Sequence, residues 1–382
     1  GYDRAIKIGS KGYPGSGVQK TDSEKGLRGS KEAFSESVKM NTALIRKRIR
    51  NAKMKAEEKQ VGRYSATTTA LLYLDGVVYL PICEEMRKRL DAFEVDGIED
   101  GGMIEYLTRK KKEGRFPVYQ TTERPDRAAQ AILEGRVVLL TDNSPEALIF
   151  PATLNSLFQT ADDYYRNERI VTFLRLIRYV AAFLALALPG LYVAAATFHP
   201  QLLPGNLIRS MAEARSGVPF PTAAEVLPRE LSFELLREAG IRIPGPMGST
   251  IGIVGGLIIG QAAVEANIVS PVVVIVIAFT ALCSFAIPNE EFAAAFRILK
   301  FFFIGMCAWL GFFGFLIALL AVFLHLASLK SFGIPYLMPF AGADLTNYQD
   351  ERDSLLRMPL FYLKKRPIFA SRRNKTRLRW KE

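Results

Sequence analysis

The sequence predicts an α-helical polytopic membrane domain, with about four transmembrane helices plus amphipathic helices, preceded by an N-terminal α/β soluble domain. Hydrophobic residues make up 49% of the 382 residues, which is ordinary for a globular protein. Beyond residue 178, however, they gather into long runs without charged side chains. Before residue 160, strand-like and helix-like segments alternate instead, which is typical of an α/β domain.

The N-terminal part divides into two segments. Residues 1–65 are polar and charge-rich, and 31–49 follow the pattern of a basic amphipathic helix. That helix either packs on its own domain or lies on an anionic membrane surface. Residues 66–160 are expected to form a cytoplasmic α/β subdomain with a mixed sheet. Its strands are predicted at 67–74, 117–121, 137–141 and 147–150, and its helices at 81–93, 101–111 and 125–134.

Residues 161–330 are predicted to form the membrane domain, because an apolar helix of ~20 residues crosses a bilayer. The expected spans are 176–197, 249–266, 269–288 and 301–328. The second is shorter and rich in glycine, and the last is long enough to form one tilted helix. The segment 198–248, between the first two spans, is interpreted as amphipathic helices at the membrane surface or against the bundle.

Charge predicts the orientation of these spans. Residues 330–382 carry 12 Lys and Arg against 5 Asp and Glu, so the basic tail 331–382 is placed on the cytoplasmic side. The charged helix before the first span is placed there too, and four crossings put both ends on one side. The segment 198–248, and the connection that carries Glu290 and Glu291, then lie outside.

The glycine-rich span is the candidate site. Four small residues at near-helical spacing form one face that allows another helix to approach closely: Gly252, Gly256, Gly260 and Ala263. Three polar residues fall near the opposite side: Thr250, Gln261 and Glu265. This polar face either lines an ion pathway in an oligomer or simply reaches the aqueous interface.

The remaining chemistry-bearing residues predict no enzyme, metal site or cofactor. The three cysteines, Cys83, Cys283 and Cys307, form no CxxC pair, and His199 and His325 lie far apart without a carboxylate or cysteine at ligand spacing. Such residues form neither a zinc site nor a nucleophile with its base. Nucleic acid is not expected as a partner, because most of the excess positive charge follows the last apolar run.

Several longer motifs occur in a fixed order along the chain, among them Thr122–Ala128 (TERPDRA), Gly217–Pro221 (GVPFP), Leu231–Gly240, Ile251–Gly255, Ile259–Glu265 and Ser331–Tyr336 (SFGIPY). Together they resemble the A subunits of the GerA family of spore germination proteins, and also the closely related stage V sporulation protein AF. The likeness covers roughly residues 2–370. The resemblance implies two N-terminal subdomains, so residues 1–65 are interpreted as a remnant of a truncated first subdomain.

The resemblance also implies a function. It predicts a homo-oligomeric subunit in the lipid of the spore inner membrane, with both termini on the cytoplasmic, spore core side. Its implied partners are a permease-like B subunit and a lipoprotein C subunit, and its implied role is to form or gate an ion-release channel that triggers germination on nutrient sensing. The alternatives are a non-conducting membrane scaffold that docks the permease-like nutrient-binding subunit, and a secondary transporter, which ranks last because no internal repeat is found.

Overall fold

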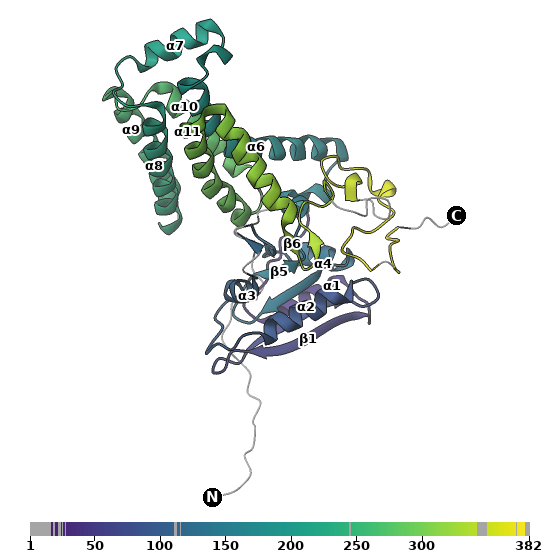
Figure 1. Cartoon of the computed structure of the whole chain (residues 1–382). Coiled ribbons are helices and arrows are strands. Elements are labelled where there is room, and N and C mark those ends of the chain that lie inside the picture. Colours follow the sequence, from purple (N-terminus) through teal and green to yellow (C-terminus); the bar gives the residue numbers. More distant parts are fainter. Residues whose placement is uncertain are drawn as a thin grey trace, which may run out of the picture.

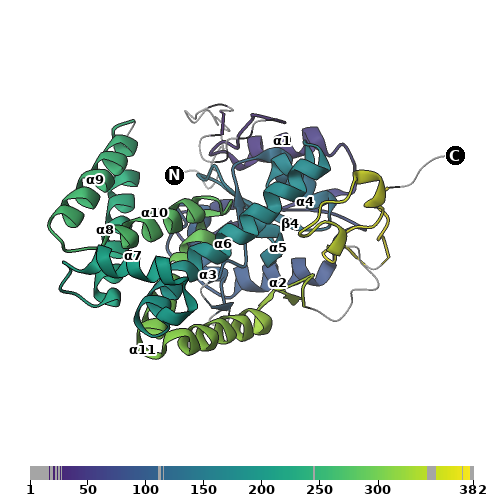
Figure 2. The same ribbon diagram turned by 90° about the horizontal axis from the view of Figure 1, so that it is seen from above.

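The computed structural model describes residues 28–110, 116–243, 246–341 and 350–378, apart from Arg372, together with isolated positions at 17, 20–21, 24, 26 and 113–114. An α/β domain and a helical bundle lie end to end, and the C-terminal tail returns from the bundle to the α/β domain (Figure 1). Figure 2 shows the same arrangement from above, with α9 at the end of the molecule remote from the tail.

The α/β domain is built on a sheet that has five strands in the described part of the chain, in the order β1-β2-β4-β5-β3, all antiparallel. The strands are β1 (Met54–Val61), β2 (Thr67–Leu74), β3 (Gln120–Thr122), β4 (Val137–Thr141) and β5 (Ala147–Phe150). The helices are α1 (Val38–Arg48), α2 (Leu80–Asp91), α3 (Gly101–Thr108), α4 (Pro125–Leu133) and α5 (Leu154–Phe158). The mixed sheet predicted from the alternating pattern was therefore wrong.

The sheet is covered on both faces, because successive side chains of a strand point to opposite sides. In β2, Leu71 and Tyr73 join a core formed with α2, α3 and the start of α11. Leu72 and Leu74 join a second core on the other face, formed with α1 and α4. A continuous apolar strand at the centre of the sheet follows from this arrangement.

Strand β1 was not predicted from the sequence, because five of its eight residues are charged or polar. It lies at the edge of the sheet, where one face meets solvent and charged side chains are tolerated. Glu57 on this strand accepts hydrogen bonds from Arg87 at 2.9 Å. Helix α1 packs on the same sheet. Much of the segment 31–65, which was expected to be separate from the α/β subdomain, is therefore part of the folded domain.

The helical bundle contains α6 (Glu168–Thr197), α7 (Gly205–Arg215), α8 (Thr222–Arg242), α9 (Pro246–Glu265), α10 (Pro271–Phe285) and α11 (Glu290–Ser328). Two helices of the described chain, α6 and α11, are long and apolar enough to cross a membrane, and α10 is a shorter apolar helix. Helix α6 packs along α11, where Gly190 faces Phe303 and Cys307.

Helix α11 reverses direction at Gly311, whose φ of 62° and ψ of −140° are not helical. Rings on both sides of the reversal meet: Phe303 lies 5.6 Å from Phe315, and Phe116 of the α/β domain contacts both Phe296 and His325. The second half runs back towards the small strand pair β6 (Lys330–Ser331) and β7 (Ile334–Pro335) (Figure 1). The expected single tilted helix over 301–328 is instead broken at Gly311 and contributes to both limbs of a helical hairpin.

This arrangement changes the expected orientation of two connections. Ile287 and Phe292, which flank Glu290 and Glu291, belong to the core of the α/β domain, so this connection lies on the soluble domain's side rather than outside. Helix α8 runs antiparallel to the first half of α11, with Glu230 bonded to Lys300. Its end therefore returns towards the same side, and the segment 198–248 is not confined to the far end of the bundle.

Candidate functional site

Helices α8, α9 and α10 enclose a groove of about 630 Å³. Its lining is predominantly apolar, with three polar or charged side chains: Arg229, Gln261 and Glu265. The apolar and glycine positions are Phe233, Leu236, Gly256, Gly260, Val264, Pro271, Val274, Ile275, Ile277 and Ala278. A groove of this size and composition, with a few polar groups, is the usual form of a binding site or pathway in a helical protein.

Glycines of α9 allow Arg229 to lie flat against the helix. A Cβ atom at Gly260 would lie 2.9 Å from Nη2 of Arg229, so a larger residue would displace the guanidinium from this position. The same Nη2 is 3.4 Å from the carbonyl oxygen of Gly256 and donates a long hydrogen bond to it. No carboxylate pairs with Arg229 among the described residues, so its charge faces the groove.

Part of the predicted small-residue face of α9 therefore contacts other helices of the same chain. Gly256 has open space where a Cβ would be, whereas Gly255, which was not singled out, approaches Leu236 of α8. Ala263 packs against the core shared with α10. That the face packs against a second copy of the chain stays a prediction.

The predicted polar face is partly described. Gln261 and Glu265 are exposed and line the groove beside Gly256 and Gly260, rather than a separate opposite face. Thr250 and Gly252 lie in the first turns of α9, but their surroundings fall outside the described part of the chain.

Buried charges on α8 were missed from the sequence. Glu225 accepts a hydrogen bond from the backbone N of Ser270 at 3.0 Å and pairs with Arg215. Glu230 accepts a 2.5 Å hydrogen bond from Nζ of Lys300 on α11, and both side chains are almost fully buried. The sequence offers one signal for such a pair, the lysine at position 300 beside an apolar run. Ionisable groups that are buried inside an apolar helical bundle typically pair with one another or serve a function.

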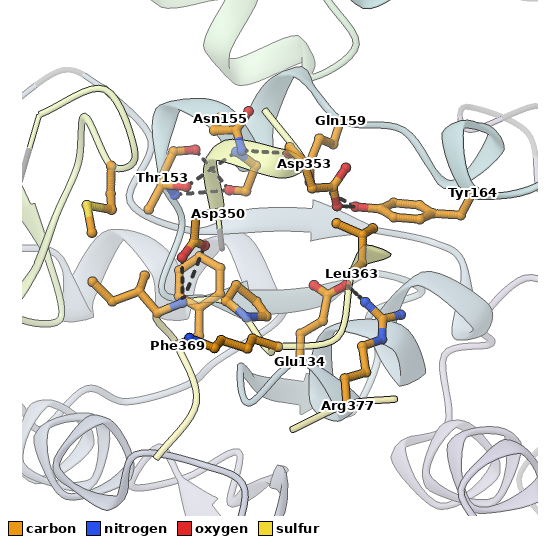
Figure 3. Close-up of a pocket in the computed structure, with 15 residues that line it drawn as sticks. Glu134, Thr153, Asn155, Gln159, Tyr164, Asp350, Asp353, Leu363, Phe369 and Arg377 are labelled. Atoms are coloured by element: carbon orange, nitrogen blue, oxygen red, sulfur yellow. Dashed lines mark hydrogen bonds and ion pairs between the residues drawn. The ribbon is translucent and has the colours of Figure 1, made fainter. Parts of the chain in front are cut away.

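A second charged network joins the α/β domain, α6 and the tail. Arg175 is 1% exposed and donates to Asp163 at 3.0 Å and to Asp353 of the tail at 2.8 Å. Tyr164 also donates to Asp353, at 2.6 Å, as Figure 3 shows. Burial opposes ionisation of Asp163, but hydrogen bonds and charge from Arg178 and Arg175 outweigh it and lower the pKa of Asp163.

The chemistry of these clusters is recognition and charge pairing. Within the described residues, no three His, Cys, Asp or Glu side chains are placed to hold a metal ion. Cys83, Cys283 and Cys307 are all buried and unbridged, and burial raises the pKa of the Cys83 thiol to about 12. A thiol with such a pKa is a poor nucleophile.

Comparison with known proteins shows the family. Residues 1–369 match the family model described as Bacillus/Clostridium GerA spore germination protein. The chain is 39% identical to spore germination protein KA of Bacillus subtilis (strain 168) over 377 residues, which cover 99% of this chain and 69% of that one. It is 38% identical to spore germination protein GerLA of Bacillus cereus over 372 residues, covering 97% and 75% of the two chains.

Among solved structures, the N-terminal domain of the A subunit of the Bacillus megaterium spore germinant receptor GerK3 matches 32% of this chain and 97% of its own, at 33% identity and a TM-score of 0.26. The family match extends over almost all of the sequence, through both the α/β domain and the bundle that carries the groove. The chain therefore belongs to the GerA family of spore germination proteins.

Proposed function

We propose that this chain is the A subunit of a spore germinant receptor, and that it oligomerises in the spore inner membrane to form or gate an ion-release channel. Its relatives are named as spore germination proteins, and its bundle contains apolar helices of spanning length. In this proposal it works with a permease-like B subunit and a lipoprotein C subunit, and both of its termini lie on the spore core side.

The observation that carries the channel proposal is the groove between α8, α9 and α10. It combines an open glycine surface at Gly256 with the charged or polar side chains of Arg229, Gln261 and Glu265. A second copy of α9 would bring its own glycine face against this surface, and the polar side chains would then line a shared passage. Single polar groups in such a passage favour the entry of ions without trapping them.

The chain path supports a revised membrane arrangement for this proposal. We infer six passes, formed by α6, α8, α9, α10 and the two halves of α11 on either side of Gly311. An even number keeps the α/β domain and the basic tail on the same side, in agreement with the positive-inside rule. Two carboxylates of α8, Glu225 and Glu230, lie within the bundle in this arrangement, where Arg215 and Lys300 balance them.

Ion flux from liposomes that contain the purified chain, alone and with B and C subunits, tests the proposal. Glu265→Gln and Gln261→Ala are expected to change the rate or the ion selectivity. Glu213→Gln on α7 is the matched control, because that side chain is 70% exposed and does not line the groove. Absence of flux in every combination, with retained binding to the permease-like subunit, favours the non-conducting scaffold instead.

A further inference from the structure

The tail segment 355–362 has an inverted pattern of burial. Its apolar side chains are exposed, between 37% and 58%, at Leu355, Leu356, Met358, Leu360, Phe361 and Tyr362. The charged Arg357 between them is only 5% exposed. A loop surrounded by water normally buries leucine side chains and exposes arginine. The outer surface of this segment is therefore not adapted to a fully aqueous environment.

The inversion is held in place by directed contacts. Arg357 donates from Nη1 to the carbonyl oxygen of Arg166 at 2.9 Å, and its backbone N donates to Oγ1 of Thr172 at 3.1 Å. Its guanidinium also lies 5.4 Å from the ring centroid of Tyr164. Because the arginine faces inward, the neighbouring Leu356 and Met358 face outward.

The tail segment lies beside α6, where Arg357 bonds Thr172, and α6 has an exposed apolar face of its own. Ile170, Phe173, Ile177 and Val180 are between 44% and 62% exposed, and their spacing of three and four puts them on one side of the helix. Thr172, which bonds the tail, directly precedes Phe173 in the chain. Exposed apolar surfaces of this kind mark a contact with a membrane or a protein.

Positive charge lies on the C-terminal side of this apolar surface. Lys364 and Lys365 follow the segment and are exposed, whereas Arg352 before it stands beside the exposed Glu351. The sequence contains no Asp or Glu between residues 354 and 381. Basic side chains beside a membrane-facing apolar surface are attracted to anionic headgroups, and they would repel an equally basic protein surface.

We propose that residues 355–362 form an interfacial loop that inserts into the headgroup region of an anionic bilayer, beside the base of α6. Interfacial apolar segments reach about 5–10 Å into this region. The loop therefore ties the α/β domain to the lipid surface, because the same tail docks on that domain. The carbonyl oxygen of Asp353 accepts a hydrogen bond from Gln159, and Arg377 pairs with Glu134 (Figure 3). This inference rests on the membrane placement proposed above and goes beyond the channel role.

The test uses the full chain, one copy per lipid nanodisc, with a polarity-sensitive fluorophore on Leu356→Cys or Leu360→Cys. The native cysteines are buried, which leaves the introduced thiol as the reactive one. Gln60→Cys, on the exposed face of β1, is the matched control. Both tail labels are expected to shift their emission to the blue, to be quenched by brominated lipid and to lose quenching by aqueous iodide, more so with phosphatidylglycerol than with phosphatidylcholine alone.

Each other outcome contradicts a defined part of the reasoning. Iodide access equal to that of the Gln60 label overturns the inserted loop. Protection that arises only when a second copy or another subunit is added makes the surface a protein interface and overturns the lipid assignment. Equal protection in neutral lipid overturns the role of the basic residues. A chain that does not enter nanodiscs refutes the membrane placement itself, whereas the other outcomes leave that placement intact.

Discussion

The buried pair between Glu230 and Lys300 should be one of the strongest single determinants of how α8 packs in the bundle. Their side chains are 1% and 6% exposed, and the Nζ–Oε2 distance is 2.5 Å. Oε1 of Glu230 has no hydrogen-bond partner, so Lys300→Met leaves a carboxylate without its only direct partner. Breaking a buried pair in this way costs about 3–5 kcal/mol of unfolding free energy.

The double variant Glu230→Gln with Lys300→Met distinguishes pairing from packing. Removing both charges should recover about 2 kcal/mol or more of the loss, because the cost comes mainly from the unpaired charge. Denaturant titration of the full chain in detergent, followed by circular dichroism, measures both values. The control is Glu238→Gln, whose partner Arg242 is 77% exposed, and which should change stability by less than about 1 kcal/mol. Equal losses in the single and double variants would refute the reasoning.

Three further predictions concern the hairpin and the tail. Gly311→Ala should destabilise the chain by about 1–3 kcal/mol in the same titration, because φ is +62° and the new Cβ would lie 3.0 Å from Phe198; an unchanged midpoint would contradict the reversal. Burial raises the pKa of Asp350 to about 7 from 3.8, so between these two pH values the folded state binds more protons than the unfolded state. Docking of the tail should therefore weaken as the pH rises from about 4 to about 7 and change little above that range. Hydrogen exchange of the tail measures this dependence, which Asp350→Asn should abolish. Gly135→Ala places a Cβ 2.7 Å from the backbone of Ala370 and should speed proteolysis of the tail, whereas an unaltered cleavage rate would count against the docked position.

The parts of the fold that local pattern controls were predicted well. Strand β2 was expected at 67–74 and spans Thr67–Leu74, because a central strand buried on both faces is apolar throughout. The same reason explains β4 and β5. Strand β1 was missed because an edge strand carries charged residues, and its position depends on pairing with β2 rather than on its own side chains.

Several residues that the sequence singled out on the glycine-rich helix line the groove: Gly256, Gly260, Gln261 and Glu265. They stand out in the sequence because glycine and polar residues are unusual in an apolar helix, whereas their roles in contact between copies and in an ion pathway stay predictions. Arg229 was missed, because its contact with Gly260 joins two helices whose packing is not encoded in either one.

The sequence by itself determined the class of this protein: an α/β segment, apolar helices of spanning length and a basic tail follow from composition and periodicity, which are local properties. Only the tertiary structure decided the path of the chain. The reversal at Gly311 occurs within an apolar run that carries no polar residue to mark it. The bond from Lys300 to Glu230 joins residues 70 positions apart, and such pairings depend on which helices become neighbours.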